Sequence, residues 1–175
     1  GLGDVYKRQS FDYTIKIWDL ATGACVATLE GHEGSVESLA VLAGGQLASG
    51  SSDEKMKIWD LATGACVATL EGHEDWVRCL AVLEGGQLAS GSNDETIKLW
   101  DLATGACMAT LEGHEGNVCS LAVLERGRLA SGSYDRTVKI WDIASRACVA
   151  TLEGHLGSVE SLAVLDGGRL ASGSF

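Results

Sequence analysis

The sequence predicts an all-β protein made of repeated four-stranded antiparallel units, and three observations support this prediction. First, the chain repeats itself every 41 residues, as the spacing of four tryptophans shows: Trp18, Trp59, Trp100 and Trp141. Second, short apolar runs alternate with turn residues, and the 175 residues include 23 glycines and no proline, which is typical of strands joined by tight turns. Third, repeats of this length are characteristic of solenoids and propellers, in which neighbouring units stack on one another.

The repeats divide the chain into four copies and the start of a fifth. The copies are residues 10–50, 51–91, 92–132 and 133–173, and the fifth begins at 174–175. Residues 1–9, GLGDVYKRQ, do not match the repeat, since Arg8 stands where the other copies have a Ser. We therefore expect a leader of non-native appearance at 1–9 and a repeat array at 10–175.

Each repeat contains four apolar runs that are bounded by turn residues. Across the first two copies these runs are VESLAVL (36–42), QLASGS (46–51), KMKIWDL (55–61) and CVATLEG (66–72). The AGG, SSDE and ATG segments between them contain residues that tolerate tight or left-handed turns. Four strands in an antiparallel meander follow, and such a small sheet needs neighbouring sheets to cover its two faces.

Four features of the copies resemble the WD-repeat (WD40) β-propeller family. They are GH at 31–32, LASGS at 47–51, Asp53 and IWD at 58–60. The resemblance extends from Ser10 to the C-terminus. It implies a β-propeller of four-stranded antiparallel blades, with about four 41-residue repeats that form part of a larger ring, since propellers have about four to eight blades.

The resemblance also implies a structural role for one His, Ser, Asp and Trp of each repeat. In the family these side chains form one hydrogen-bonded chain, which suits a buried indole that needs an acceptor and a hydroxyl that both accepts and donates. Three complete sets are present: His32, Ser49, Asp53 and Trp59; His73, Ser90, Asp94 and Trp100; His114, Ser131, Asp135 and Trp141.

Ser, His and Asp are also the members of a hydrolase triad. A triad occurs once per site, whereas this trio recurs together with a Trp, as a structural unit does. The chain also has neither a glycine-rich phosphate loop of the right spacing nor a GxSxG elbow. We therefore predict no catalytic residues, no enzyme activity and no cofactor; a propeller enzyme or lectin is the disfavoured alternative.

Cysteine recurs once per copy, and two further cysteines bring the total to six: Cys25, Cys66, Cys79, Cys107, Cys119 and Cys148. Zinc sites usually combine closely spaced ligands such as CxxC, whereas residues 41 apart fall on different blades. We expect no metal site and small buried thiols instead. Free thiols also favour a reducing compartment, so we expect an intracellular protein, cytoplasmic or nuclear.

The charge of the chain limits its partners. The formal net charge is -11, with 13 Lys and Arg against 24 Asp and Glu. Nucleic-acid binding depends on clustered Lys and Arg, so no nucleic acid is expected. No apolar run approaches the roughly 18 residues that cross a bilayer, so no membrane is expected either. A protein or peptide with a basic surface is the partner that this charge favours.

The differences between the copies mark the candidate binding surface. Three positions vary most: the residue before the turn Asp, and the residues three and five positions after the GH histidine. The candidate residues are Phe11, Ser35, Glu37, Ser52, Trp76, Arg78, Asn93, Asn117, Cys119, Tyr134, Ser158 and Glu160. In the family these positions surround the mouth of the propeller's top face, and Trp, Tyr and Arg are common in interface hot spots. We predict a non-catalytic protein–protein interaction scaffold; neutral variation at exposed positions is the alternative.

The two ends of the chain are complementary, because it begins with the last two strands of a blade and finishes with the first two. Three arrangements follow. Residues 174–175 pair with the 12–18 region and close a four-bladed ring, two chains form an eight-bladed ring as a homodimer, or the chain is a fragment of a longer array. The fragment is the simplest account, and it includes the alternative that the chain has no independent activity.

Overall fold

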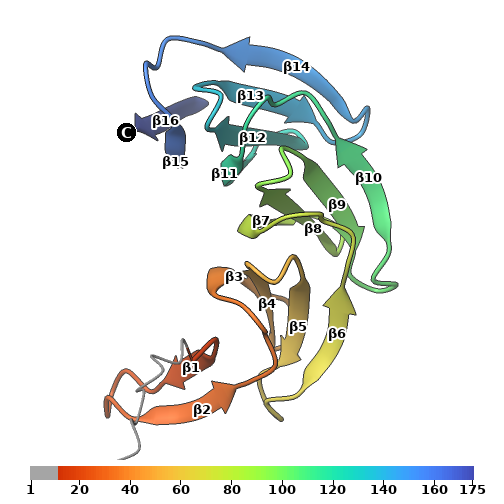
Figure 1. The fold of residues 1–175 in the computed structure, drawn as a ribbon, viewed down its shortest axis with the longest axis vertical. Coiled ribbons are helices and arrows are strands. Elements are labelled where there is room, and N and C mark those ends of the chain that lie inside the picture. Colours follow the sequence, from red (N-terminus) through yellow and green to blue (C-terminus); the bar gives the residue numbers. More distant parts are fainter. Residues whose placement is uncertain (1–11) are drawn as a thin grey trace, which may run out of the picture.

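The computed structural model describes residues 12–175, which form strands joined by turns and loops (Figure 1). The strands are β1 Ile15–Trp18, β2 Cys25–Leu29, β3 Val36–Leu42, β4 Gln46–Ser51, β5 Met56–Asp60, β6 Cys66–Leu70, β7 Val77–Leu83, β8 Gln87–Ser92, β9 Ile97–Asp101, β10 Cys107–Leu111, β11 Val118–Leu124, β12 Arg128–Ser133, β13 Val138–Asp142, β14 Ala147–Leu152, β15 Val159–Leu165 and β16 Arg169–Ser174. The described part of the chain has no helix long and apolar enough to cross a membrane.

The strands form three complete blades and two half-blades. Blade I is β3–β6, blade II is β7–β10 and blade III is β11–β14, while β1–β2 and β15–β16 are two-stranded sheets that we call the N-terminal and C-terminal half-blades. Consecutive strands within each sheet pair antiparallel. Figure 1 shows the sheets as an open arc, with β3, β7, β11 and β15 on its inner side. The predicted β-propeller fold is therefore confirmed as a partial propeller.

The two half-blades do not meet. Among residues 12–175, β1 pairs only with β2 and β16 pairs only with β15, and Figure 1 shows the half-blades at opposite ends of the arc. The four-bladed ring within one chain is therefore wrong for this structure. Phe175 bonds instead within its own half-blade, where its N–H donates to the Ser158 carbonyl at 3.1 Å.

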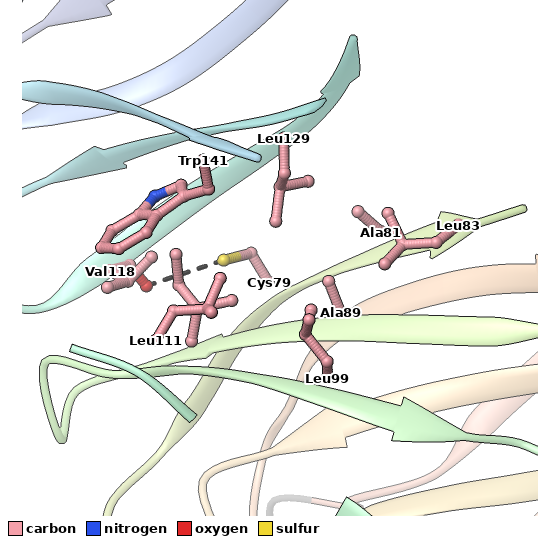
Figure 2. Packing of buried hydrophobic residues seen from close by; sticks show 10 residues of the cluster. Cys79, Ala81, Leu83, Ala89, Leu99, Leu111, Val118, Leu129 and Trp141 are labelled. Carbon is pink, nitrogen blue, oxygen red and sulfur yellow. Dashed lines mark hydrogen bonds between the residues drawn. The ribbon is translucent and has the colours of Figure 1, made fainter. Parts of the chain in front are cut away.

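The core lies between neighbouring blades. In blade II the adjacent residues Leu88 and Ala89 are both fully buried, although they point to opposite faces of the sheet. Figure 2 shows one of these interfaces, where Leu99 and Leu111 of blade II lie against Leu129 and Trp141 of blade III. A middle blade therefore buries both of its faces, as stacked repeats require.

Close packing between blades requires glycine at one point of the second strand. A Cβ atom added to Gly91 would lie 2.6 Å from Val118 Cγ1 and 2.7 Å from Cys79 Sγ. Both distances are shorter than van der Waals contact, so the LASGS sequence has glycine here because the inner strand of the next blade approaches the backbone.

The expectation of buried thiols is wrong for the cysteine that recurs in every copy. Cys79 is buried and Cys119 is half-buried, but the four recurring cysteines are exposed: Cys25, Cys66, Cys107 and Cys148. These four lie at or near the start of the outermost strands β2, β6, β10 and β14, which no further strand of the same blade covers.

Candidate functional site

The first candidate site is the chain of four polar side chains in each complete blade. In blade II, His73 precedes β7, Ser90 lies on β8, Asp94 lies in the turn after β8 and Trp100 lies on β9. Trp100 Nε1 donates to Ser90 Oγ at 2.8 Å, and the His73 ring joins Ser90 Oγ through Nε2 and Asp94 Oδ2 through Nδ1, both at 2.7 Å.

The same hydrogen-bonded set of four side chains forms in the other two complete blades. The corresponding residues are His32, Ser49, Asp53 and Trp59 in blade I and His114, Ser131, Asp135 and Trp141 in blade III. The three serines have no solvent exposure and the three tryptophans at most 2%. A substrate therefore has no path to these hydroxyls, and the arrangement suits a structural role rather than nucleophilic catalysis.

In blades I and III the electrostatics of the four side chains favour a neutral histidine beside an ionised aspartate. Burial lowers the pKa of His32 and of His114, although the neighbouring Asp opposes this shift. Burial would raise the pKa of Asp135, but hydrogen bonds from His114 and Thr137 outweigh it and lower the pKa to about 2. In this state the imidazole Nδ1–H donates to the carboxylate and Nε2 accepts from the serine hydroxyl.

These pKa shifts predict acid sensitivity with two onsets. His32 and His114 have lower pKa values in the folded state, so their contribution to stability is present above the unfolded pKa of about 6.5 and is lost as the pH falls below it. Asp135 likewise stabilises the fold above about pH 4, and this contribution is lost as the pH falls towards 2.

We therefore expect the thermal midpoint, followed by circular dichroism, to fall between pH 7 and pH 5 and again below pH 4. His114→Gln should flatten the first step, because it removes one of the titrating imidazoles. A midpoint that is constant or rises between pH 7 and pH 5 would contradict the assignment of neutral histidines.

Each half-blade contains two members of a further His–Ser–Asp–Trp set. His155 Nε2 lies 2.7 Å from Ser172 Oγ in the C-terminal half-blade, but no Asp or Trp follows Ser172 in this sequence. Asp12 and Trp18 occupy the Asp and Trp positions of the repeat at the N-terminal half-blade, where Trp18 is 54% exposed. Each half-blade thus has half of a set.

The second candidate site is the variable face, which we define by eleven residues: Ser35, Glu37, Ser52, Trp76, Arg78, Asn93, Asn117, Cys119, Tyr134, Ser158 and Glu160. Phe11, the twelfth predicted residue, lies outside the described residues. Backbone hydrogen bonds place two of the three variable positions of each complete blade side by side. The N–H of Asn93 donates to the Trp76 carbonyl, and that of Tyr134 to the Asn117 carbonyl, both at 2.9 Å. Ser52 and Ser35 form the same bond.

Arg78 connects residues of the variable face from all three complete blades. Its guanidinium lies 3.6 Å from the Glu37 carboxylate on β3 and donates to the Tyr134 hydroxyl, after β12, at 3.5 Å. Arg78 also acts on Cys119 of β11: burial raises the pKa of this thiol, and the Arg78 charge opposes the increase. Trp76 and Tyr134 remain exposed, at 43% and 41%. The structure thus brings three other variable residues, Glu37, Cys119 and Tyr134, together around Arg78. Ser158 and Glu160 belong to the C-terminal half-blade side.

Sequence reasoning assigned no role to the aspartate that follows the recurring tryptophan. Asp60 Oδ1 accepts hydrogen bonds from the Ala62 and Thr63 N–H groups and from the Thr63 hydroxyl, at 2.8 to 3.0 Å. The same turn forms at Asp19, Asp101 and Asp142. A local signal was present, because Asp followed three residues later by Thr or Ser is a turn pattern.

No group of three or more potential metal ligands occurs among the described side chains. The variable face offers hydrogen-bonding, ionic and aromatic groups, which suit recognition of another molecule.

Comparison with known proteins identifies the family. The family model described as "WD domain, G-beta repeat" matches residues 23–60, 64–101, 105–142 and 146–175. The fold is similar to the crystal structure of the computationally designed Ika8 protein, with a TM-score of 0.82 and 32% sequence identity. That alignment covers 93% of this chain and 50% of the Ika8 chain, so this chain spans about half the length of that protein. No curated protein matches the sequence. With four family matches over most of its length, the chain belongs to the WD40 repeat family.

Proposed function

We propose that the chain is a non-catalytic scaffold that binds a protein or peptide on the variable face. WD40 repeats generally serve protein interaction, and the family is typically non-catalytic. The contact of Arg78 with Glu37 and Tyr134 is the observation that supports the variable face as the binding surface. It joins varying residues of three blades into one continuous surface.

The exposed aromatic groups give this surface its binding capacity. Trp76 and Tyr134 present large rings to solvent, and such residues contribute much of the binding energy when a partner covers them. The net charge of -11 supports a partner with a basic surface and gives no support to nucleic acid. The six free cysteines support an intracellular location, in the cytoplasm or nucleus.

The test starts from a defined ligand. A random peptide library is selected on the immobilised chain, and one enriched peptide is measured by calorimetry. Replacing both Trp76 and Arg78 with Ser should weaken its binding about 100-fold, because two residues of hot-spot type are lost. Circular dichroism should remain unchanged.

The matched control replaces Val67 and Arg126 with Ser. Both side chains are exposed and lie outside the variable face. This control should bind the peptide as the original chain does. Equal binding by the chain, the Trp76/Arg78 variant and the control would overturn the assignment of the variable face.

A further inference from the structure

Two arginines of blade III stand where the other copies have glycine. Arg126 lies in the turn between β11 and β12, and the corresponding residues are Gly44, Gly85 and Gly167. Arg146 lies in the turn between β13 and β14, and the corresponding residues are Gly23, Gly64 and Gly105. All of these residues have a left-handed backbone, with φ between 61° and 74°.

A left-handed backbone is unfavourable for arginine. Its Cβ atom crowds a neighbouring carbonyl group in this conformation, whereas glycine adopts the conformation freely. Blade III therefore loses some stability at two positions where the other copies do not. Residues in such strained conformations occur frequently at ligand-binding sites. Both exceptions lie in one blade and at the same end of its strands, which suggests that they have a common role.

Arg126 and Arg146 line the same cavity, which lies between blades II and III and has a volume of about 370 Å³. The Ile143 N–H donates to the Gly127 carbonyl at 3.0 Å and so joins the two turns that contain the arginines. Blade II contributes a polar and two apolar side chains to the wall: Gln87, Leu99 and Met108. A cavity of this size, with apolar walls and a few polar groups, is typical of small-molecule sites.

The two guanidinium groups at this cavity are unpaired. Neither forms a hydrogen bond or an ion pair with any of residues 12–175. The carboxylate of Asp142 also lines the cavity, but it already accepts from the Ser145 N–H and hydroxyl, at 2.8 and 2.7 Å. These hydrogen bonds, together with the charge of Arg128 on the paired strand, lower the pKa of Asp142. Two unpaired positive charges thus meet at one cavity of a chain whose net charge is -11.

We propose that this cavity binds a small organic anion. Its carboxylate or phosphate group lies between the guanidinium groups of Arg126 and Arg146, and its apolar body lies against Met108 and Ile143. Planar guanidinium groups bind both kinds of oxyanion through paired hydrogen bonds. Gln87 also lines the cavity, so its amide offers a further donor. The anion supplies the partner that both arginines lack, and the strained turns hold the two guanidinium groups at one place.

This cavity is separate from the variable face. Arg126 precedes β12, whereas Tyr134 of the variable face follows the same strand, so the two sites lie at opposite ends of blade III. Neither Trp76 nor Arg78 lines the cavity. Replacing Arg126 should therefore leave peptide binding at the variable face unchanged, as its use in the control variant requires. Failure of one site would leave the other site standing.

Two-dimensional NMR of the ¹⁵N-labelled chain tests the site with small probes. Phenyl phosphate or phenylacetate should shift the amide signals of residues 126–127 and 143–146 in a saturable way, and the probe that binds more tightly identifies the oxyanion. Inorganic phosphate lacks the apolar body and benzyl alcohol lacks the charge, so each should bind about tenfold more weakly than that probe. The absence of a saturable shift with either anionic probe would overturn the proposal. Equal affinity for inorganic phosphate or benzyl alcohol would overturn it as well.

Two glycine variants test the arginines. Arg126→Gly and Arg146→Gly restore the residue of the other copies, so each removes a guanidinium group and also relieves the backbone. Each should weaken binding of the preferred probe about tenfold, and the double variant about 100-fold. The thermal midpoint should not fall.

Arg136→Gly is the matched control. Arg136 also has a left-handed backbone, with φ of 72°, but it lies after β12, at the other end of the blade. This variant loses the same charge and should bind the probe as the original chain does. Undiminished binding by the double variant would overturn the proposal. An equal loss of binding in Arg136→Gly would also overturn it, because the overall charge rather than the cavity would then attract the anion.

Discussion

Replacing Trp100 with Ala is expected to lower the free energy of unfolding by about 3 to 5 kcal/mol, the usual cost of removing a fully buried tryptophan side chain. Trp100 is 1% exposed and packs in one cluster with Leu70 and Leu88. Its Nε1 also donates to Ser90 Oγ, so the substitution removes a hydrogen bond from a fully buried serine as well as a large apolar surface.

Urea denaturation at pH 7 and at one fixed protein concentration measures this effect, since association with other chains changes apparent stability. Trp76→Ala is the matched control. Trp76 is 43% exposed, so its loss should change the free energy of unfolding by about 0.5 kcal/mol or less. If the two variants lost equal stability, the interface between blades I and II would not be the source of the effect.

Replacing Asp94 with Ala is expected to cost about 3 kcal/mol, because hydrogen bonds to a charged acceptor are worth roughly 1.5 to 3 kcal/mol each and buried donors lose their partner. Asp94 accepts from His73 at 2.7 Å, from the Glu74 N–H at 3.1 Å, and from the Thr96 N–H and hydroxyl at 3.0 and 2.7 Å. The His73 ring would keep Ser90 and lose its only carboxylate partner among the described residues.

Asp101→Ala is the control for this prediction. Asp101 also accepts backbone hydrogen bonds, from Ala103 and Thr104, but it lies in a solvent-exposed turn where water replaces a lost partner. The thermal midpoint should fall clearly further for Asp94→Ala than for Asp101→Ala. Equal shifts of the thermal midpoint would mean that the hydrogen-bonded His–Ser–Asp–Trp set adds no more stability than an ordinary turn does.

The fold could be predicted because the repeat shows the same local signals several times. The run QLASGS at 46–51 and strand β4, Gln46–Ser51, coincide residue for residue. KMKIWDL was expected over seven residues, whereas β5 covers only Met56–Asp60, because strand ends depend on where the turn begins. The exposure of Cys25 could not be predicted from the surrounding sequence alone, since a small apolar residue fits either a buried strand or the free edge of a blade.

The four-residue hydrogen-bonded sets could be predicted from the sequence. His, Ser, Asp and Trp recur at one spacing, for example at His73, Ser90, Asp94 and Trp100. The contacts of Arg78 could not be predicted, because they depend on how three blades turn relative to one another. Glu37 and Tyr134 lie in different repeats, and no local pattern indicates that both reach the same guanidinium.

The blades stack in one row, and this arrangement determines where local unfolding of the chain begins. Contacts between inner strands run from β3 to β7, from β7 to β11 and from β11 to β15, so each blade is held by its immediate neighbours. Blade II can open only by breaking two interfaces, whereas each half-blade breaks one. Opening therefore begins by fraying at the ends and travels inwards.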